Sequence, residues 1–160
     1  MRQSFAVSSL FKERILLPPE SISNSLLGYL FLREKLLEIV LGDSETNILY
    51  WVGKEIGNTL NIQVPEELED IFAQLDFGQV YLEHQSPSTV GYRITHNRLN
   101  LLPKHRLESS LSLEAGLMAG AMEKVTGHYC ASTLSVQEQK GITYALIEIS
   151  IDEEKSAILE

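Results

Sequence analysis

The chain has 160 residues, of which 44% are apolar, and this suits one domain with a sizeable core. Its formal net charge of −9 comes from 13 basic and 22 acidic residues, and it works against nucleic acid and anionic membranes as partners. A single cysteine, Cys130, excludes an internal disulfide and fits a reducing compartment, so we expect a cytoplasmic protein.

Residues 1–19 are expected to form an N-terminal arm, closed by the extended break that Pro18-Pro19 enforces. The charged residues 12–14 interrupt its apolar residues, so no secretory signal is expected. No apolar run in the chain approaches the ~20 residues of a membrane-spanning helix, so no membrane insertion is expected. The arm either covers this domain's own core or docks on a partner, and both interpretations stay open.

Three helices are predicted after the arm, at about residues 21–41, 46–61 and 65–76. The third begins with Pro65 and two acids, which favour the first turn of a helix. The first is so rich in Leu and Phe that we expect it to be buried on more than one side, as in a core that is also a dimer contact.

Four strands are predicted in two hairpins, at residues 80–85 with 90–95 and 129–137 with 142–151. An irregular loop over 100–108 and a helix over 112–127 separate the hairpins. The order ααα-ββ-α-ββ predicts an α+β fold: an antiparallel four-stranded sheet with about four helices packed on one face. We expect one domain over residues 20–152 and a frayed acidic tail over 153–160.

The helix over 112–127 has few charges and unusually small residues, so it is expected to be mostly buried. Its Gly116 and Gly120 share one side, as Gly53 and Gly57 do on the second helix. Each glycine costs roughly 1 kcal/mol relative to alanine in a helix interior, so a close approach should offset the cost. A neighbouring helix is the more common occupant of such a stripe, and a ligand is the alternative.

Short motifs in the C-terminal half point to a known superfamily. They are Leu113-Glu-Ala-Gly116, Gly120, Gly127 and Gly141. With the order of elements, they resemble the 4-vinyl-reductase domain superfamily, which includes the small subunits of the TRAPP vesicle-tethering complex.

A closer resemblance rests on three further segments, which are Tyr50-Trp51-Val52-Gly53-Lys54, Asn97-Arg98-Leu99 and Leu113-Glu114-Ala115-Gly116. On these, the chain is similar to the YslB-like bacterial proteins of unknown function, over roughly residues 22–151. The resemblance implies an apolar pocket between helices and sheet, and dimers formed through helices.

Some members of the superfamily carry metal-binding cysteines near the last two strands, or a cysteine joined to a fatty acyl chain. Here the turn at 137–141 has no cysteine, and Cys130 matches neither position. A zinc site needs about four ligands, and the four histidines lack metal-binding spacing, so no metal and no cofactor are expected. His84 alternates with Val80 and Leu82, so it is predicted to be a packed strand residue. His128 and Cys130, two apart on one strand, are too far separated for a nucleophile pair.

Glu114, in the first turn of the buried helix, has Arg98 just upstream. The pair either works as an acid–base site or braces the loop between them as an ion pair. Candidate ligand-binding residues are Tyr50, Trp51, Gly53, Gly57, Arg98, Glu114, Gly116, Leu117, Gly120 and Tyr144. No catalytic motif stands out.

The favoured function is therefore a non-enzymatic binding or scaffold domain. It would form a homodimer through its first two helices and hold a small apolar ligand between the glycine-striped helices and the sheet. One alternative is an enzyme that uses Glu114, Arg98 and His96 on a small molecule. The other is a structural partner of another bacterial protein that docks through the N-terminal arm.

Overall fold

A computed structural model describes residues 23–157, and the predicted arm over 1–19 lies outside them. The elements are α1 (Asn24–Leu30), π-helical η3 (Phe31–Leu36), α2 (Leu37–Leu41), 3-10 helix η4 (Gly42–Ser44), α3 (Glu45–Thr59), α4 (Glu67–Gln74), β1 (Gln79–Gln85), β2 (Thr89–Thr95), 3-10 helix η5 (Asn97–Leu101), α5 (Lys104–Ser110), α6 (Ser112–Thr126), β3 (His128–Gln139) and β4 (Ile142–Ser156).

The sheet has the strand order β1-β2-β4-β3, and every neighbouring pair is antiparallel. This confirms the predicted α+β fold with an antiparallel four-stranded sheet. β4 runs on to Ser156, which pairs with His128 at the start of β3. Residues 153–156 are therefore strand, and the expectation that the tail frays from residue 153 is wrong there, because β3 supplies a partner that far.

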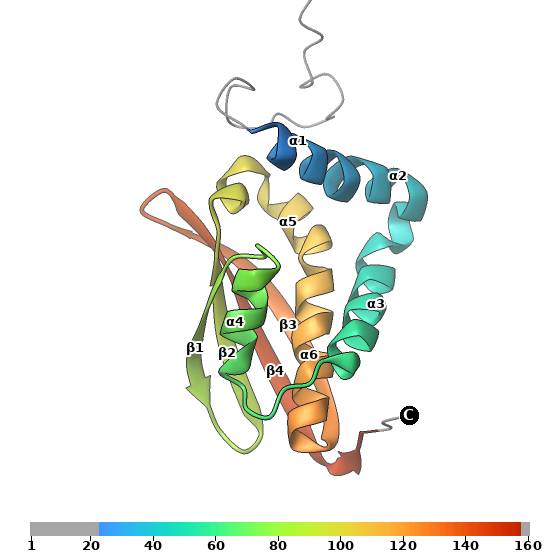
Figure 1. The fold of residues 1–160 in the computed structure, drawn as a ribbon, viewed down its shortest axis with the longest axis vertical. Helices are drawn as coiled ribbons and strands as arrows, with labels where there is room; N and C mark the ends of the chain where they lie inside the picture. Colours follow the sequence, from blue (N-terminus) through green and yellow to red (C-terminus); the bar gives the residue numbers. More distant parts are fainter. Residues whose placement is uncertain (1–22, 158–160) are drawn as a thin grey trace, which may run out of the picture.

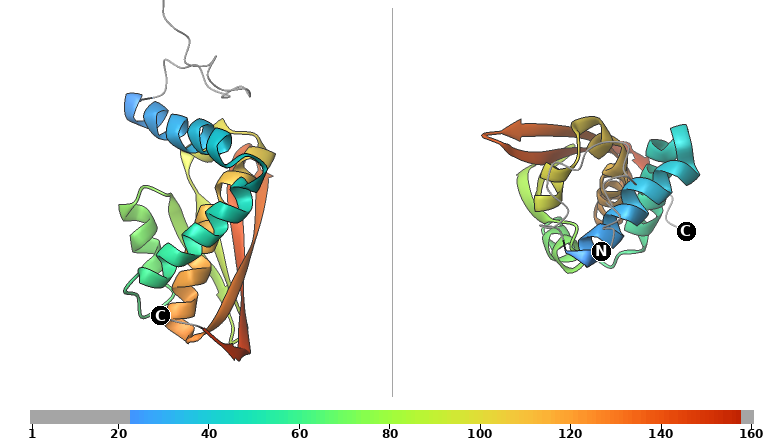
Figure 2. Two further views of the ribbon diagram at one scale, coloured as in Figure 1. Left: turned by 90° about the vertical axis from the view of Figure 1, so that its right-hand side faces the viewer. Right: turned by 90° about the horizontal axis from the view of Figure 1, so that it is seen from above.

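The helices form more than one layer on one face of the sheet (Figures 1 and 2). Among the described elements, α4, α5 and α6 pack directly on the strands, α3 lies over α6, and the helix from α1 to α2 crosses one end. The expected arrangement of about four helices on one face is corrected accordingly. Helix α5 replaces part of the loop predicted over 100–108, because Pro103 is extended at its N-cap and leaves the helix after it intact.

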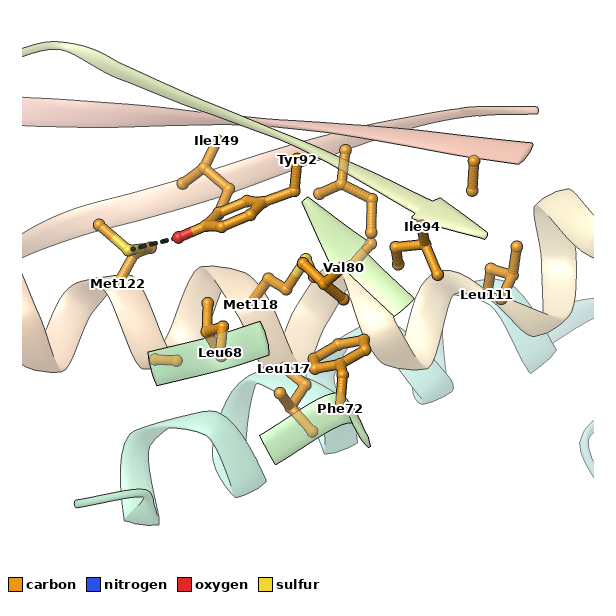
Figure 3. Packing of buried hydrophobic residues seen from close by; sticks show 14 of the residues in the cluster. Leu68, Phe72, Val80, Tyr92, Ile94, Leu111, Leu117, Met118, Met122 and Ile149 are labelled. Atoms are coloured by element: carbon orange, nitrogen blue, oxygen red, sulfur yellow. Dashed lines mark hydrogen bonds between the residues drawn. The ribbon is translucent and has the colours of Figure 1, made fainter. Parts of the chain in front are cut away.

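The core lies between α6, α4 and the inner face of the sheet (Figure 3). β2 supplies Val90, Tyr92 and Ile94 in strict alternation, as a half-buried strand should. The Tyr92 hydroxyl is satisfied inside this core, since it donates to the Pro65 carbonyl (3.1 Å) or the Met122 sulfur (3.6 Å). The predicted burial of α6 is thereby explained, because the sheet covers one side of it and α3 the other.

His84 does not share the core face with Val80 and Leu82. The pairing of β1 with β2 shifts between Leu82 and His84, and this bulge turns the side chain to the outer face of the sheet. There the ring lies over Gly91, with Nε2 3.0 Å from Glu148 Oε1 and 51% of the side chain exposed. The prediction of a packed histidine is wrong, because a bulge reverses the alternation on which it rested.

The four striped glycines bring the backbones of α3 and α6 into direct contact. A Cβ added at Gly53 or Gly57 would overlap the carbonyl of Leu113 or Leu117 on α6. A Cβ at Gly116 or Gly120 would overlap the carbonyl of Tyr50 or Lys54 on α3. Both stripes thus meet in one seam, which we call the α3–α6 seam, and helix backbone occupies it.

Replacing Gly116 with alanine should therefore destabilise the protein strongly. The new methyl group would have to push two helix backbones apart, and overpacking of this kind costs about 3 kcal/mol. Gly28→Ala is the matched control, because nothing lies within 4 Å of its added Cβ, and it should stabilise α1 by about 1 kcal/mol. Urea unfolding measures both changes, and equal stability of the two variants would contradict the seam.

Candidate functional site

The predicted ligand-binding residues do not converge on one site. The four glycines and Leu117 lie in the α3–α6 seam and the core. Tyr50 packs against the core, and its hydroxyl accepts a hydrogen bond from the Ser132 amide (3.1 Å). Trp51 is 58% exposed on α3, and Tyr144 donates to Gln137 Oε1 (2.9 Å) on the outer face of the sheet. Arg98 and Glu114 meet at a separate place, as a buried ion pair.

Glu114 is the centre of a buried ion-pair cluster. Its side chain is 0% exposed, one oxygen accepts from Arg98 Nη2 (3.0 Å), and the other pairs with Arg33 Nη2. Both arginines also donate to the Tyr29 hydroxyl, Arg33 over 2.8 Å and Arg98 over 2.5 Å. The loop bearing Arg98 is thus braced to α6, and to the first helix as well.

A second cluster lies beside the first. Arg106 of α5 pairs with Glu34 (2.8 Å) and, through two nitrogens, with Glu45 (2.5 and 2.6 Å). Burial raises the pKa of Glu34 above its usual range, against the opposite effect of Arg106. The π-helical turn η3 makes both clusters possible, because it buries the consecutive residues Arg33 and Glu34 together.

The Glu114 geometry is that of a brace. Both carboxylate oxygens are occupied and no water can reach them, whereas a general acid or base must meet its substrate. His96 accepts a hydrogen bond at Nδ1 from the Arg98 amide (3.0 Å), and its Nε2 lies 3.5 Å from Asp76. The three residues of the enzyme alternative therefore do not face one open site.

A third buried ion pair joins Lys54 on α3 to Glu123 on α6, and neither residue is among the predicted ligand-binding residues. The Lys54 Nζ lies 2.7 Å from Glu123 Oε1, donates to the Cys130 carbonyl (2.7 Å) and sits 3.9 Å from the centre of the Tyr129 ring. Lys54 directly follows Gly53 in the sequence. The position of Gly53 at a close helix contact was therefore the signal that could have pointed to Lys54.

The outward sides of the first helix and of α3 are apolar. Large hydrophobic residues are exposed there, and we call this set the outer apolar face: Phe31, Leu32, Leu36, Ile39, Val40, Ile48, Trp51, Val52 and Ile56. The middle of the first helix is thus inverted, with Arg33 and Glu34 inside and Leu32 and Leu36 outside. Sequence reasoning expected an apolar contact on this helix, and its buried charges were missed.

A groove of about 770 Å³ lies on another side of the first helix. Tyr29 and Leu26 line it from α1, Leu75 from the end of α4, and His96 and Arg98 from the segment after β2. Two residues of the Glu114 cluster, Tyr29 and Arg98, therefore line a concave surface.

Metal and membrane features give no further site. Among residues 23–157, no three His, Cys, Asp or Glu side chains are grouped to hold a metal ion. In the same part of the chain, no helix combines the length and the apolar character needed to cross a bilayer.

Glu114→Gln should destabilise the protein by about 3 kcal/mol, because two buried guanidinium groups would lose their shared carboxylate. Glu108→Gln is the control, since its pair with Lys104 is exposed and should contribute less than about 0.5 kcal/mol. Urea unfolding at neutral pH compares them. A Glu114→Gln variant as stable as the parent would contradict the brace.

Cys130 should resist alkylation in the folded protein. The residue is buried, and burial raises the pKa of its thiol to about 11, so about one molecule in a thousand is a thiolate at pH 8. Mass spectrometry after iodoacetamide treatment should show full labelling in guanidinium chloride and almost none without it. Rapid labelling of the native protein would show that the thiol is accessible.

The fold is shared with proteins of known structure. A vinyl-4-reductase family protein from Methanocaldococcus jannaschii is similar with a TM-score of 0.58 and 22% identity, over 82% of this chain and 83% of that one. Trafficking protein particle complex subunit 3 from Naegleria fowleri, solved covalently bound to palmitic acid, gives 0.51 and 15%, over 81% and 95%. At these identities the likeness concerns the fold alone, and it agrees with the resemblance that the sequence motifs indicated.

A search of curated proteins gives no significant match. The model of one protein family, described as "Protein of unknown function (DUF2507)", matches residues 26–150. Since the match spans most of the chain, the protein belongs to the DUF2507 family.

Proposed function

We propose that this protein is a non-enzymatic scaffold that pairs with a second copy of itself through the outer apolar face. The observation that carries the proposal is the exposure of large apolar side chains on two successive helices. Ile39 and Val40 are each 67% exposed, and Trp51 is 58% exposed. Exposed apolar groups that gather in this way are typical of protein–protein interfaces.

The inverted first helix supports this proposal. Its inward side is held by the ion pairs of Arg33 and Glu34 and by a small cluster around Leu30, so its exposed Leu32 and Leu36 contribute little to the fold of one chain. Burying them against a partner would gain about 25 cal/mol per Å² of apolar surface. The exposed apolar side chains of this helix therefore stabilise the protein only if a partner covers its outward side.

A second copy is the occupant that we favour. An apolar patch is complementary to itself under two-fold symmetry, because it needs no opposite charge on the partner. Each copy carries a net charge of −9, so the attraction has to come from apolar contact. Aromatic Trp51 near the middle of the α3 side is the kind of residue that dominates such contacts.

The other parts of the proposal follow from the site. The four seam glycines leave a ligand no room, so an apolar molecule would have to bind elsewhere on the domain. A buried, unpaired thiol is compatible with a reducing cytoplasm, where we place the protein. The alternative in which residues 1–19 dock on another bacterial protein concerns a part of the chain outside the described residues.

Sedimentation velocity tests the pairing. The parent protein should be a dimer at micromolar concentration, and Val52→Glu or Ile39→Glu should weaken the dimer by at least about tenfold, because each places an unpaired charge in an apolar contact. Ile142→Glu is the control, since Ile142 is similarly exposed but lies outside the outer apolar face, at the start of β4.

The dimer and the role of the arm can be separated by deleting residues 1–19. A truncated chain that remains a dimer supports pairing through the outer apolar face. A parent protein that is monomeric at micromolar concentration contradicts the proposal, and so does a dimer that survives both helix substitutions.

A further inference from the structure

We infer that the groove beside Tyr29 binds a small amphiphilic carboxylate, with its head at Tyr29 and His96 and its apolar part against leucines. This inference does not depend on pairing, because the groove and the outer apolar face use different residues. The groove, at about 770 Å³, is in the size range of small-molecule sites.

The Tyr29 hydroxyl can donate a hydrogen bond to a ligand. Its oxygen accepts hydrogen bonds from Arg33 Nη1 and Arg98 Nη1, which together occupy its lone pairs. Among the described residues, no acceptor for its own O–H is found, and Tyr29 is one of the residues that line the groove. Burial raises the pKa of Tyr29 in spite of the two arginines, so the group keeps this proton at neutral pH.

His96 supplies a second donor at the same groove. Its Nδ1 accepts a hydrogen bond from the Arg98 amide, which fixes the ring and leaves the proton of the neutral form on Nε2. The nearest carboxylate to Nε2 is that of Asp76, at 3.5 Å, and its side chain is 95% exposed. A bound carboxylate would therefore compete for this N–H with a weakly held, solvated partner.

The charges behind these donors favour a single negative charge. Arg33 and Arg98 share one carboxylate, Glu114, so two positive groups face one negative group. Glu34, which also influences Arg33, pairs with Arg106 in the neighbouring cluster, where one guanidinium group meets two carboxylates. Asp76 is the opposing charge on the groove wall, and its exposure keeps its effect small. A carboxylate has two acceptor oxygens, which match the two donors, and one negative charge, which matches the positive excess of the Glu114 cluster taken by itself.

Apolar side chains line the part of the groove that would contact the hydrocarbon chain of the ligand. Leu26, Leu75 and Leu101 line the groove, and Leu101 also packs on Leu30 in a small cluster under α1. A short hydrocarbon chain attached to the carboxylate would cover this part of the wall. The pairing of a charged end with an apolar end distinguishes this groove from a site for an inorganic anion.

The test uses hexanoate as the probe and hexanol as its neutral counterpart, each titrated into the ¹⁵N-labelled full chain and followed by NMR. Hexanoate should shift the amide signals of residues 25–29 and 96–100 in a saturable way and bind at least about tenfold more tightly than hexanol, because the head meets charge-assisted donors. Tyr29→Phe should weaken hexanoate binding by about tenfold, since it removes the O–H donor and keeps the ring.

Two further variants serve as a control for Tyr29→Phe and as an independent test of the groove. Tyr81→Phe is the matched control, because the Tyr81 hydroxyl bonds to Gln79 on β1, away from the groove, and hexanoate affinity should not change. Asn97→Asp places a negative charge on the exposed groove wall without touching the buried clusters, and should weaken binding about fivefold by repulsion. The inference is overturned if hexanol binds as tightly as hexanoate, if the shifts map to the outer apolar face, or if Asn97→Asp and Tyr29→Phe both bind like the parent.

Discussion

The contact between the backbones of α3 and α6 sets the position of most of the molecule. Four helical glycines cost roughly 4 kcal/mol in helix propensity, and the close contact between the two helices must offset this. With α3 on one side and the sheet on the other, α6 keeps no polar face. Its two inward carboxylates, Glu114 and Glu123, are then confined to buried surroundings, where each needs a cation. Lys54 of α3 forms an ion pair with Glu123, and Arg33 and Arg98 form ion pairs with Glu114.

This need for cations explains the unusual first helix. Arg33 can reach Glu114 only if its side of the helix turns inward, and the π-helical turn lets Glu34 turn inward with it, toward Arg106. The exposed apolar residues before and after them are left on the outward side: Phe31, Leu32, Leu36, Ile39 and Val40. Ion pairs therefore hold the middle of this helix to the body, and a small apolar cluster around Leu30 holds its first turns. Because a buried ion pair contributes little net stability, a partner that covered the outward side would add apolar contact that this part of the helix lacks within one chain.

The sequence predicted the elements whose pattern is local. Alternation placed β2, β3 and β4 within a few residues of their ends, and the paired glycines identified the α3–α6 seam before any coordinates. Arg98 and Glu114, 16 residues apart around one loop, could be paired from the sequence. Arg33, 81 residues from Glu114, could not, because nothing local marks such a partner. The predicted faces of His84 and of the first helix were wrong for a related reason. One bulge and one π-helical turn each shift the repeat of the backbone, and with it the face on which the following side chains lie.

The first helix joins the two surfaces that we assign. Tyr29 and Arg33 belong to the cluster behind the groove, while Phe31 and Leu32, their immediate neighbours, belong to the outer apolar face. A carboxylate that bonds to Tyr29 would fix the same turn that presents Phe31 to a second copy. Since binding free energies are reciprocal, a ligand that steadies this turn must favour pairing by the same factor by which pairing favours the ligand. A helix whose middle is held by ion pairs is suited to this coupling, because a bound carboxylate would add one more charge beside the groups that hold it.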